Sequence, residues 1–225
     1  MKQKYDIFIS YRRRDAGDKA EHLKDLLEPF YKNRISFDRE NLSGRFNSQL
    51  IQRIDNVKDF LLVLGKNSLC YSADEFSENQ VNLYKELSSL SEEDFSRRII
   101  EVERHTPVDY VRIEIGRALR RKDLHIIPVV PERSSEYNLA SLTLPEDIVQ
   151  IKGYEAVFYS DSPDALFKDV LPKVRRHLKS RADLIVNKSV LAVIFCVLIL
   201  AIGFGTHFYL EKQCEIKLES QRRAM

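Results

Sequence analysis

Three consecutive arginines, Arg12, Arg13 and Arg14, follow the first apolar stretch of the chain. That stretch, residues 5–10, carries apolar or aromatic side chains at both odd and even positions, as expected of a central parallel strand. In an open α/β sheet, ligands bind at the carboxyl ends of the strands, and a guanidinium group matches the geometry of phosphate and carboxylate. The pattern therefore indicates an anion site, with a solvated basic loop after a core strand as the alternative.

A second candidate for chemistry is Glu114, an acidic residue within a largely apolar helical stretch. The stretch opens at Pro107, and proline is well suited to the start of a helix. A lone glutamate on a helix more often faces solvent than carries chemistry. From its residue type alone, Glu114 therefore stays an open candidate.

Other residue types exclude several classes of protein. The five histidines and three cysteines have no metal-ligand spacing, so we expect no structural metal. The cysteines also argue against a disulfide framework and favour a reducing compartment. A formal charge of only +2 argues against a dedicated nucleic-acid binder, and we expect no nucleic-acid partner.

The elements that must position these residues alternate between strands and helices. The region 67–106 is rich in Ser, Glu and Asn, and its weak periodicity predicts two amphipathic helices. The alternation predicts a parallel sheet of about five strands with helices on both faces. We expect strands at 5–10, 34–38, 60–64, 125–130 and within 148–158, and further helices at 17–31, 46–56, 107–119 and 162–180.

The end of the chain differs from the rest. Residues 190–210 contain no charged residue and are long enough to cross a bilayer as a helix. The alternative is a buried core helix, which is rarely apolar on every side. Lys and Arg crowd the flank 173–188 more than the other flank, so we expect a single-pass membrane protein with its N-terminal part in the cytoplasm. The expected divisions are a domain at 1–180, a basic juxtamembrane linker at 181–188, a transmembrane helix at 189–210 and a short tail at 211–225.

Four motifs now stand in order: Y-D-I-F-I-S-Y-R-R, F-D-R-E-N-L-S-G-R-F, F-L-L-V-L-G, and D-Y-V-R-I-E-I-G-R-A-L followed by H-I-I-P-V-V. This order resembles the TIR (Toll/interleukin-1 receptor) domain family over about residues 4–178. The double arginine, the loop after the second strand and the glutamate-bearing helix resemble the NAD-hydrolysing branch, which includes bacterial effectors of anti-phage defence and an animal axon-degeneration NADase. The resemblance implies a flavodoxin-like parallel sheet. The segment 67–106 departs from the family by its length, and we treat it as a helical insertion.

The resemblance implies a catalytic role for Glu114. Nicotinamide leaves NAD⁺ as a neutral molecule, so its departure needs no general acid, whereas ordinary glycoside hydrolysis uses two carboxylates. Glu114 would hold the ribose hydroxyls and stabilise the oxocarbenium-like charge as the bond breaks. NAD⁺ is then the substrate, and no separate cofactor is expected.

The resemblance also implies the residues that bind the substrate. Arg12 and Arg13 match the loop beside the nucleotide and would face phosphate or ribose. Asp38 and Phe46 flank the loop that closes over the ligand in family members, and Phe46 either stacks on a flat ring or faces the core. Tyr110 stands where many family members have tryptophan, so an aromatic wall is kept.

The expected function is that of a membrane-anchored NAD⁺ glycohydrolase, a prokaryotic immune or stress effector activated by self-assembly with other TIR protomers. Its partners would be copies of itself, the lipid bilayer and an upstream activator that the sequence does not name. A cyclase that makes cyclic ADP-ribose shares every candidate residue. A non-enzymatic TIR signalling adaptor is the alternative, and Glu114 argues against it because an adaptor has no need of that group.

Overall fold

The computed structural model describes residues 5–37, 49–131, 138–159 and 170–180. The chain divides into two compact units, Met1–Asp183 and Leu184–Met225. The second unit and the predicted membrane segment 189–210 lie outside the described residues. Within the described residues, no helix combines the length and the apolar character needed to cross a membrane.

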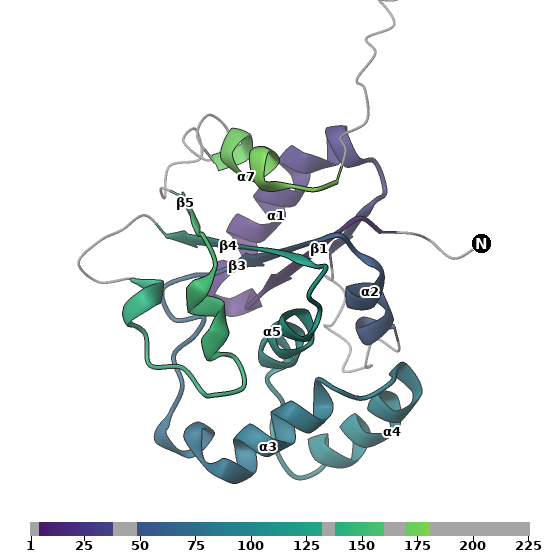
Figure 1. Cartoon of the computed structure of the whole chain (residues 1–225), viewed down its shortest axis with the longest axis vertical. Coiled ribbons are helices and arrows are strands. Elements are labelled where there is room, and N and C mark those ends of the chain that lie inside the picture. Colours follow the sequence, from purple (N-terminus) through teal and green to yellow (C-terminus); the bar gives the residue numbers. More distant parts are fainter. Residues whose placement is uncertain (1–4, 38–48, 132–137, 160–169, 181–225) are drawn as a thin grey trace, which may run out of the picture. The chain divides into compact units, whose positions relative to one another are not determined.

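A five-stranded parallel sheet forms the centre of the first unit (Figure 1). Its strands are β1 (Ile7–Tyr11), β2 (Ile35–Phe37), β3 (Asp59–Val63), β4 (His125–Pro131) and β5 (Val157–Tyr159). They lie in the order β2-β1-β3-β4-β5, and every neighbouring pair is parallel. This is the order of flavodoxin-like folds, and it confirms the predicted sheet.

Helices cover both faces of the sheet, as the alternation of apolar residues along the strands requires. Ile7 and Ile9 of β1 belong to the core beneath α1 (Arg13–Tyr31) and α7 (Leu171–His177). Phe8, between them, belongs to the core on the other face.

On that other face the core lies beneath α2 (Leu50–Asn56) and α5 (Tyr110–Arg120). There Phe8 stacks on Phe60 of β3 with ring centroids 5.6 Å apart. Helix α5 therefore rests directly on the central strands and holds its residues close to the end of β1.

The region 67–106 contains the two predicted helices, α3 (Glu78–Leu87) and α4 (Glu92–Glu103). Their apolar faces join the same core as α2 and α5, because Tyr84, Leu87 and Phe95 are buried in it. In Figure 1 these helices form an additional layer outside α5 and α2.

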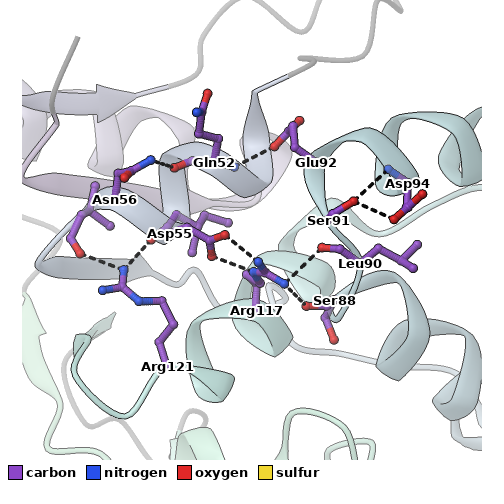
Figure 2. A network of polar contacts seen from close by, with 12 residues as sticks. Gln52, Asp55, Asn56, Ser88, Leu90, Ser91, Glu92, Asp94, Arg117 and Arg121 are labelled. Carbon is purple, nitrogen blue, oxygen red and sulfur yellow. Dashed lines mark hydrogen bonds and ion pairs between the residues drawn. The ribbon is translucent and has the colours of Figure 1, made fainter. Parts of the chain in front are cut away.

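Arg117 of α5 ties this outer layer to the domain, as Figure 2 shows. Its guanidinium makes two hydrogen bonds to the carboxylate of Asp55 on α2, at 2.7 and 2.5 Å. A third nitrogen donates to the carbonyls of Ser88 and Leu90, between α3 and α4, at 3.2 Å each. One side chain thus joins α5, α2 and the turn of the insertion.

Two helices begin at other residues than the sequence predicts. Helix α1 begins at Arg13 rather than Gly17. The sequence pattern does not detect its first turn, because Arg13 and Arg14 are exposed and the apolar periodicity starts only at Ala16. Helix α5 begins at Tyr110, and the side chain of Asp109, not Pro107, caps it by accepting a hydrogen bond from the Arg112 amide. Of the helix that we predict over 162–180, the structure describes only the part from residue 170 onward. There α7 spans Leu171–His177 and ends three residues before the predicted end.

Candidate active site

Glu114 and Ser10 meet where α5 passes the end of β1. The Ser10 hydroxyl donates to Glu114 Oε2 at 2.6 Å, although the two residues are 104 positions apart. Ser10 is buried and Glu114 is partly exposed. A hydrogen bond to a carboxylate at this distance is of the strong, charge-assisted kind, so the buried hydroxyl fixes the direction of the Glu114 carboxylate.

A cavity of about 270 Å³ opens beside this carboxylate. It lies at the carboxyl edge of the sheet, where parallel α/β folds bind ligands. It combines one carboxylate, two guanidinium groups and two tyrosine rings, which suits a ligand that has anionic groups and a flat ring and develops positive charge. Its lining residues are Phe8, Ile9, Tyr11, Arg13, Arg14, Tyr110, Val111 and Glu114.

Arg12 has a different environment from its two neighbours. Its side chain forms an ion pair with Asp109, and its Nε donates to the carbonyl of Ser68 at 3.0 Å. Burial lowers the pKa of Arg12, but Asp109, together with Tyr71 and Glu75, more than offsets this effect and the pKa is raised. Arg12 therefore fastens the turn after β1 to the residue that caps the Glu114 helix.

Arg112 holds the same end of α5 from within the protein. Its side chain is 0% exposed and forms two hydrogen bonds to Asp147, at 2.8 and 2.6 Å. It donates a third to the carbonyl of Glu75 at 3.1 Å, and its guanidinium lies 4.2 Å from the ring centroid of Tyr84. The Tyr84 hydroxyl oxygen in turn accepts a hydrogen bond from the Asp109 amide at 2.9 Å.

The two tyrosines of the cavity are each held by a neighbour. The Tyr110 hydroxyl donates to Glu103 at 2.6 Å, and burial together with that carboxylate raises the pKa of Tyr110, so the phenol stays neutral at physiological pH. The ring of Tyr11 stacks on Phe37 with centroids 4.9 Å apart. Both rings are therefore oriented before any ligand arrives.

The predicted site residues fall into three groups. Glu114, Arg13 and Tyr110 lie together in the cavity lining. Arg12 adjoins it through the Asp109 ion pair and is not among the lining residues. Asp38 and Phe46 lie outside the described residues.

Sequence reasoning did not single out Ser10, Tyr11 or Asp109. Ser10 closes the first predicted strand and Tyr11 follows it directly, although β1 extends to Tyr11; that position alone marks them as candidates for the carboxyl edge of the sheet. Asp109 precedes the apolar run of α5, which is the pattern of a helix cap. In the described part of the chain, no three His, Cys, Asp or Glu side chains are grouped so that they could hold a metal ion.

No protein-family model matches the chain. Over 70 residues the chain is 39% identical to the NAD(+) hydrolase tir-1 of Caenorhabditis elegans. The matched stretch is 31% of this chain and 7% of the length of the nematode protein. The strand order and this partial similarity together describe a TIR-like α/β domain with a distant likeness to part of an NAD⁺ hydrolase.

Proposed function

We propose that the chain is a TIR-domain NAD⁺ glycohydrolase that releases nicotinamide and forms ADP-ribose or its cyclic form. The observation that carries the proposal is the Glu114 carboxylate, fixed by Ser10 and facing a cavity with two arginines and two tyrosines. The likeness to an NAD⁺ hydrolase supports it independently. An adaptor that acts only through protein contacts would need neither the fixed carboxylate nor the cavity.

In this mechanism Glu114 acts on the ribose. The pyridinium carries a positive charge that moves to the ribose as nicotinamide leaves with the bonding electrons. A carboxylate beside the ribose stabilises that developing charge, and such electrostatic stabilisation is commonly worth roughly 10²–10³-fold per group. Water then attacks the anomeric carbon to give ADP-ribose, or an adenine nitrogen attacks it to give the cyclic product.

Arg13 and Arg14 are suited to bind the pyrophosphate, because guanidinium groups form charge-assisted hydrogen bonds with phosphate oxygens. Tyr110 and Tyr11 would offer the aromatic surface for nicotinamide. Arg12, joined to Asp109, would position α5 and so Glu114 without touching the substrate.

The size of the cavity bears on self-assembly. Small-molecule sites usually measure roughly 300–1,000 Å³, and the cavity formed by the described residues is about 270 Å³. It suits the nicotinamide-riboside half of the dinucleotide better than the whole molecule. A neighbouring protomer would complete the site, so activity should require clustering.

We propose further that residues 189–210 anchor the protein in a membrane with the domain on the cytoplasmic side. The support is the uncharged apolar run and the basic flank 173–188. NAD⁺ is a cytosolic metabolite, and confinement to a surface raises the local concentration of protomers. Protease treatment of spheroplasts tests the orientation, and cleavage of the domain from outside would contradict it.

The test of the activity is incubation of the full chain with NAD⁺ in lipid nanodiscs and, separately, clustered on vesicles. Chromatography separates nicotinamide, ADP-ribose and the cyclic product. Glu114→Gln should fold normally and lose nicotinamide release, because it keeps the shape and removes the charge. Glu78→Gln, an exposed glutamate in the first turn of α3, is the matched control. Equal turnover in wild type and Glu114→Gln would remove the catalytic role.

The two arginines provide a second test. Arg13→Ala should chiefly raise KM, because it removes a contact made in the ground state. Arg12→Ala should instead lower kcat, because it loosens the helix that carries Glu114. If both variants raise KM alone, Arg12 binds substrate directly and the positioning role is wrong.

A further inference from the structure

A second cavity, of about 410 Å³, lies between α1 and α7. We propose that it binds a phosphate-bearing anion, either the headgroup of an anionic phospholipid or a free phosphate compound. The proposal does not depend on NAD⁺ cleavage. The lining residues are Tyr31, Leu171, Pro172, Arg175, Arg176 and Ser180.

The cavity has a buried floor and a charged rim. Tyr31, Leu171 and Ser180 are only 2%, 5% and 5% exposed, whereas Arg175 and Arg176 are exposed. None of the ion pairs between described residues involves Arg175 or Arg176. Two guanidinium groups over a partly apolar floor suit an anion that carries an organic stem, because the fork of each guanidinium matches phosphate oxygens.

Arg175 is held in place before any ligand binds. Its guanidinium carbon lies 3.8 Å from the ring centroid of Phe30, a distance at which the cation is attracted to the ring face. Burial raises the pKa of Tyr31, and the nearby Arg175 charge acts against that rise. The Tyr31 hydroxyl donates to the carbonyl of Ser180 at 3.3 Å. The contacts of Phe30 and Tyr31 therefore fix both the cation and the floor beneath it.

Asp59 is the carboxylate that would repel an anion in this cavity, but other groups of the protein already donate hydrogen bonds to it. It accepts hydrogen bonds from the amides of Lys179 and Ser180, at 2.8 Å each, and from the Ser180 hydroxyl. His125 Nδ1 lies 3.3 Å from its Oδ1 atom. These contacts occupy the carboxylate and also hold the end of the domain against the sheet.

The cavity lies near the amino ends of the strands, whereas Glu114 lies near their carboxyl ends. Asp59 is the first residue of β3, whereas Ser10 lies next to the end of β1, and the two strands are parallel. A ligand in this cavity is therefore not the substrate of the Glu114 site. Residues 181–188 separate Ser180 from the predicted membrane segment, and eight extended residues span at most about 28 Å. That reach favours a lipid headgroup as the source of the phosphate.

Two measurements on the full chain distinguish the sources. The first is native mass spectrometry of protein released from nanodiscs that contain equal amounts of phosphatidylglycerol and phosphatidylcholine. The second is a calorimetric titration of the protein, in neutral detergent, with inorganic phosphate. Arg175→Gln/Arg176→Gln is the test variant, and Arg97→Gln/Arg104→Gln, exposed on and after α4, removes the same charge elsewhere.

A lipid ligand predicts that wild type and the control variant retain phosphatidylglycerol over phosphatidylcholine, and that the test variant loses this preference. A free-phosphate ligand predicts calorimetric binding that the test variant weakens by on the order of tenfold or more, without any lipid preference. The single variant Arg176→Gln leaves the Arg175–Phe30 contact intact and should show a smaller loss in the same direction. Equal behaviour of all variants in both measurements would overturn the proposal.

Discussion

The buried pair Arg112–Asp147 gives the sharpest prediction about stability. Both side chains are almost fully buried, at 0% and 3% exposure, and are joined by two hydrogen bonds. Asp147→Asn keeps the shape and leaves the guanidinium without its counter-charge. Removing one partner of a buried ion pair typically costs about 3–5 kcal/mol. For a domain of this size that corresponds to roughly 6–20 °C in Tm.

A double variant that removes both charges separates the loss of the counter-charge from the packing around the pair. Arg112→Met/Asp147→Leu removes both charges and should recover most of the loss, because apolar residues of similar volume often replace a buried pair at little cost. The assay is urea unfolding of the chain in neutral detergent, followed by far-UV circular dichroism. Asp123→Asn is the control, since its ion pair with Arg121 is on the surface and its removal should leave the midpoint unchanged. An Asp147→Asn midpoint equal to that of the control would refute the reasoning.

Three further predictions test other contacts. Ser10→Ala should lower kcat for nicotinamide release by about tenfold or more at unchanged Tm, because Glu114 loses the donor that fixes it, and an unchanged kcat would contradict that role. Gly65→Ala should lower the free energy of unfolding by about 1–3 kcal/mol in thermal melts, because a Cβ there would lie 2.6 Å from the backbone oxygen of Asp15; an unchanged melt would show that the two segments can separate. Arg117→Met should speed hydrogen exchange in α3 and α4, measured by mass spectrometry, and equal protection would show that apolar packing alone holds them.

The sheet could be predicted because each strand is a short apolar run that the hydrophobic pattern detects. The run at Phe60–Leu64 is an example, and β3 occupies nearly the same residues, Asp59–Val63. The start of α1 could not be found in the same way. Its first turn begins with two exposed arginines, Arg13 and Arg14. A search for apolar residues at helical spacing cannot detect helical residues that are charged and exposed.

The parts of the site that stayed hidden depend on contacts between distant segments. Arg112 and Asp147 are 35 positions apart, and nothing in the local sequence pairs them. Arg12 and Arg13 are neighbours of the same type, yet one contacts Asp109 and the other lines the cavity. The direction of each arginine side chain depends on how the turn after β1 packs against α5, and residue composition does not show that packing.

Helix α3 holds α5 at both ends, which gives the helical insertion a role in the site. At the first end, the Tyr84 hydroxyl accepts from the Asp109 amide and the Tyr84 ring lies against Arg112. At the other end, the Ser88 carbonyl accepts from Arg117. Because α5 carries Glu114 between these two contacts, a shift of α3 would move the carboxylate relative to Ser10 on the fixed sheet. In the proposed mechanism the insertion would therefore act on the site by setting the position of one helix, without touching the substrate.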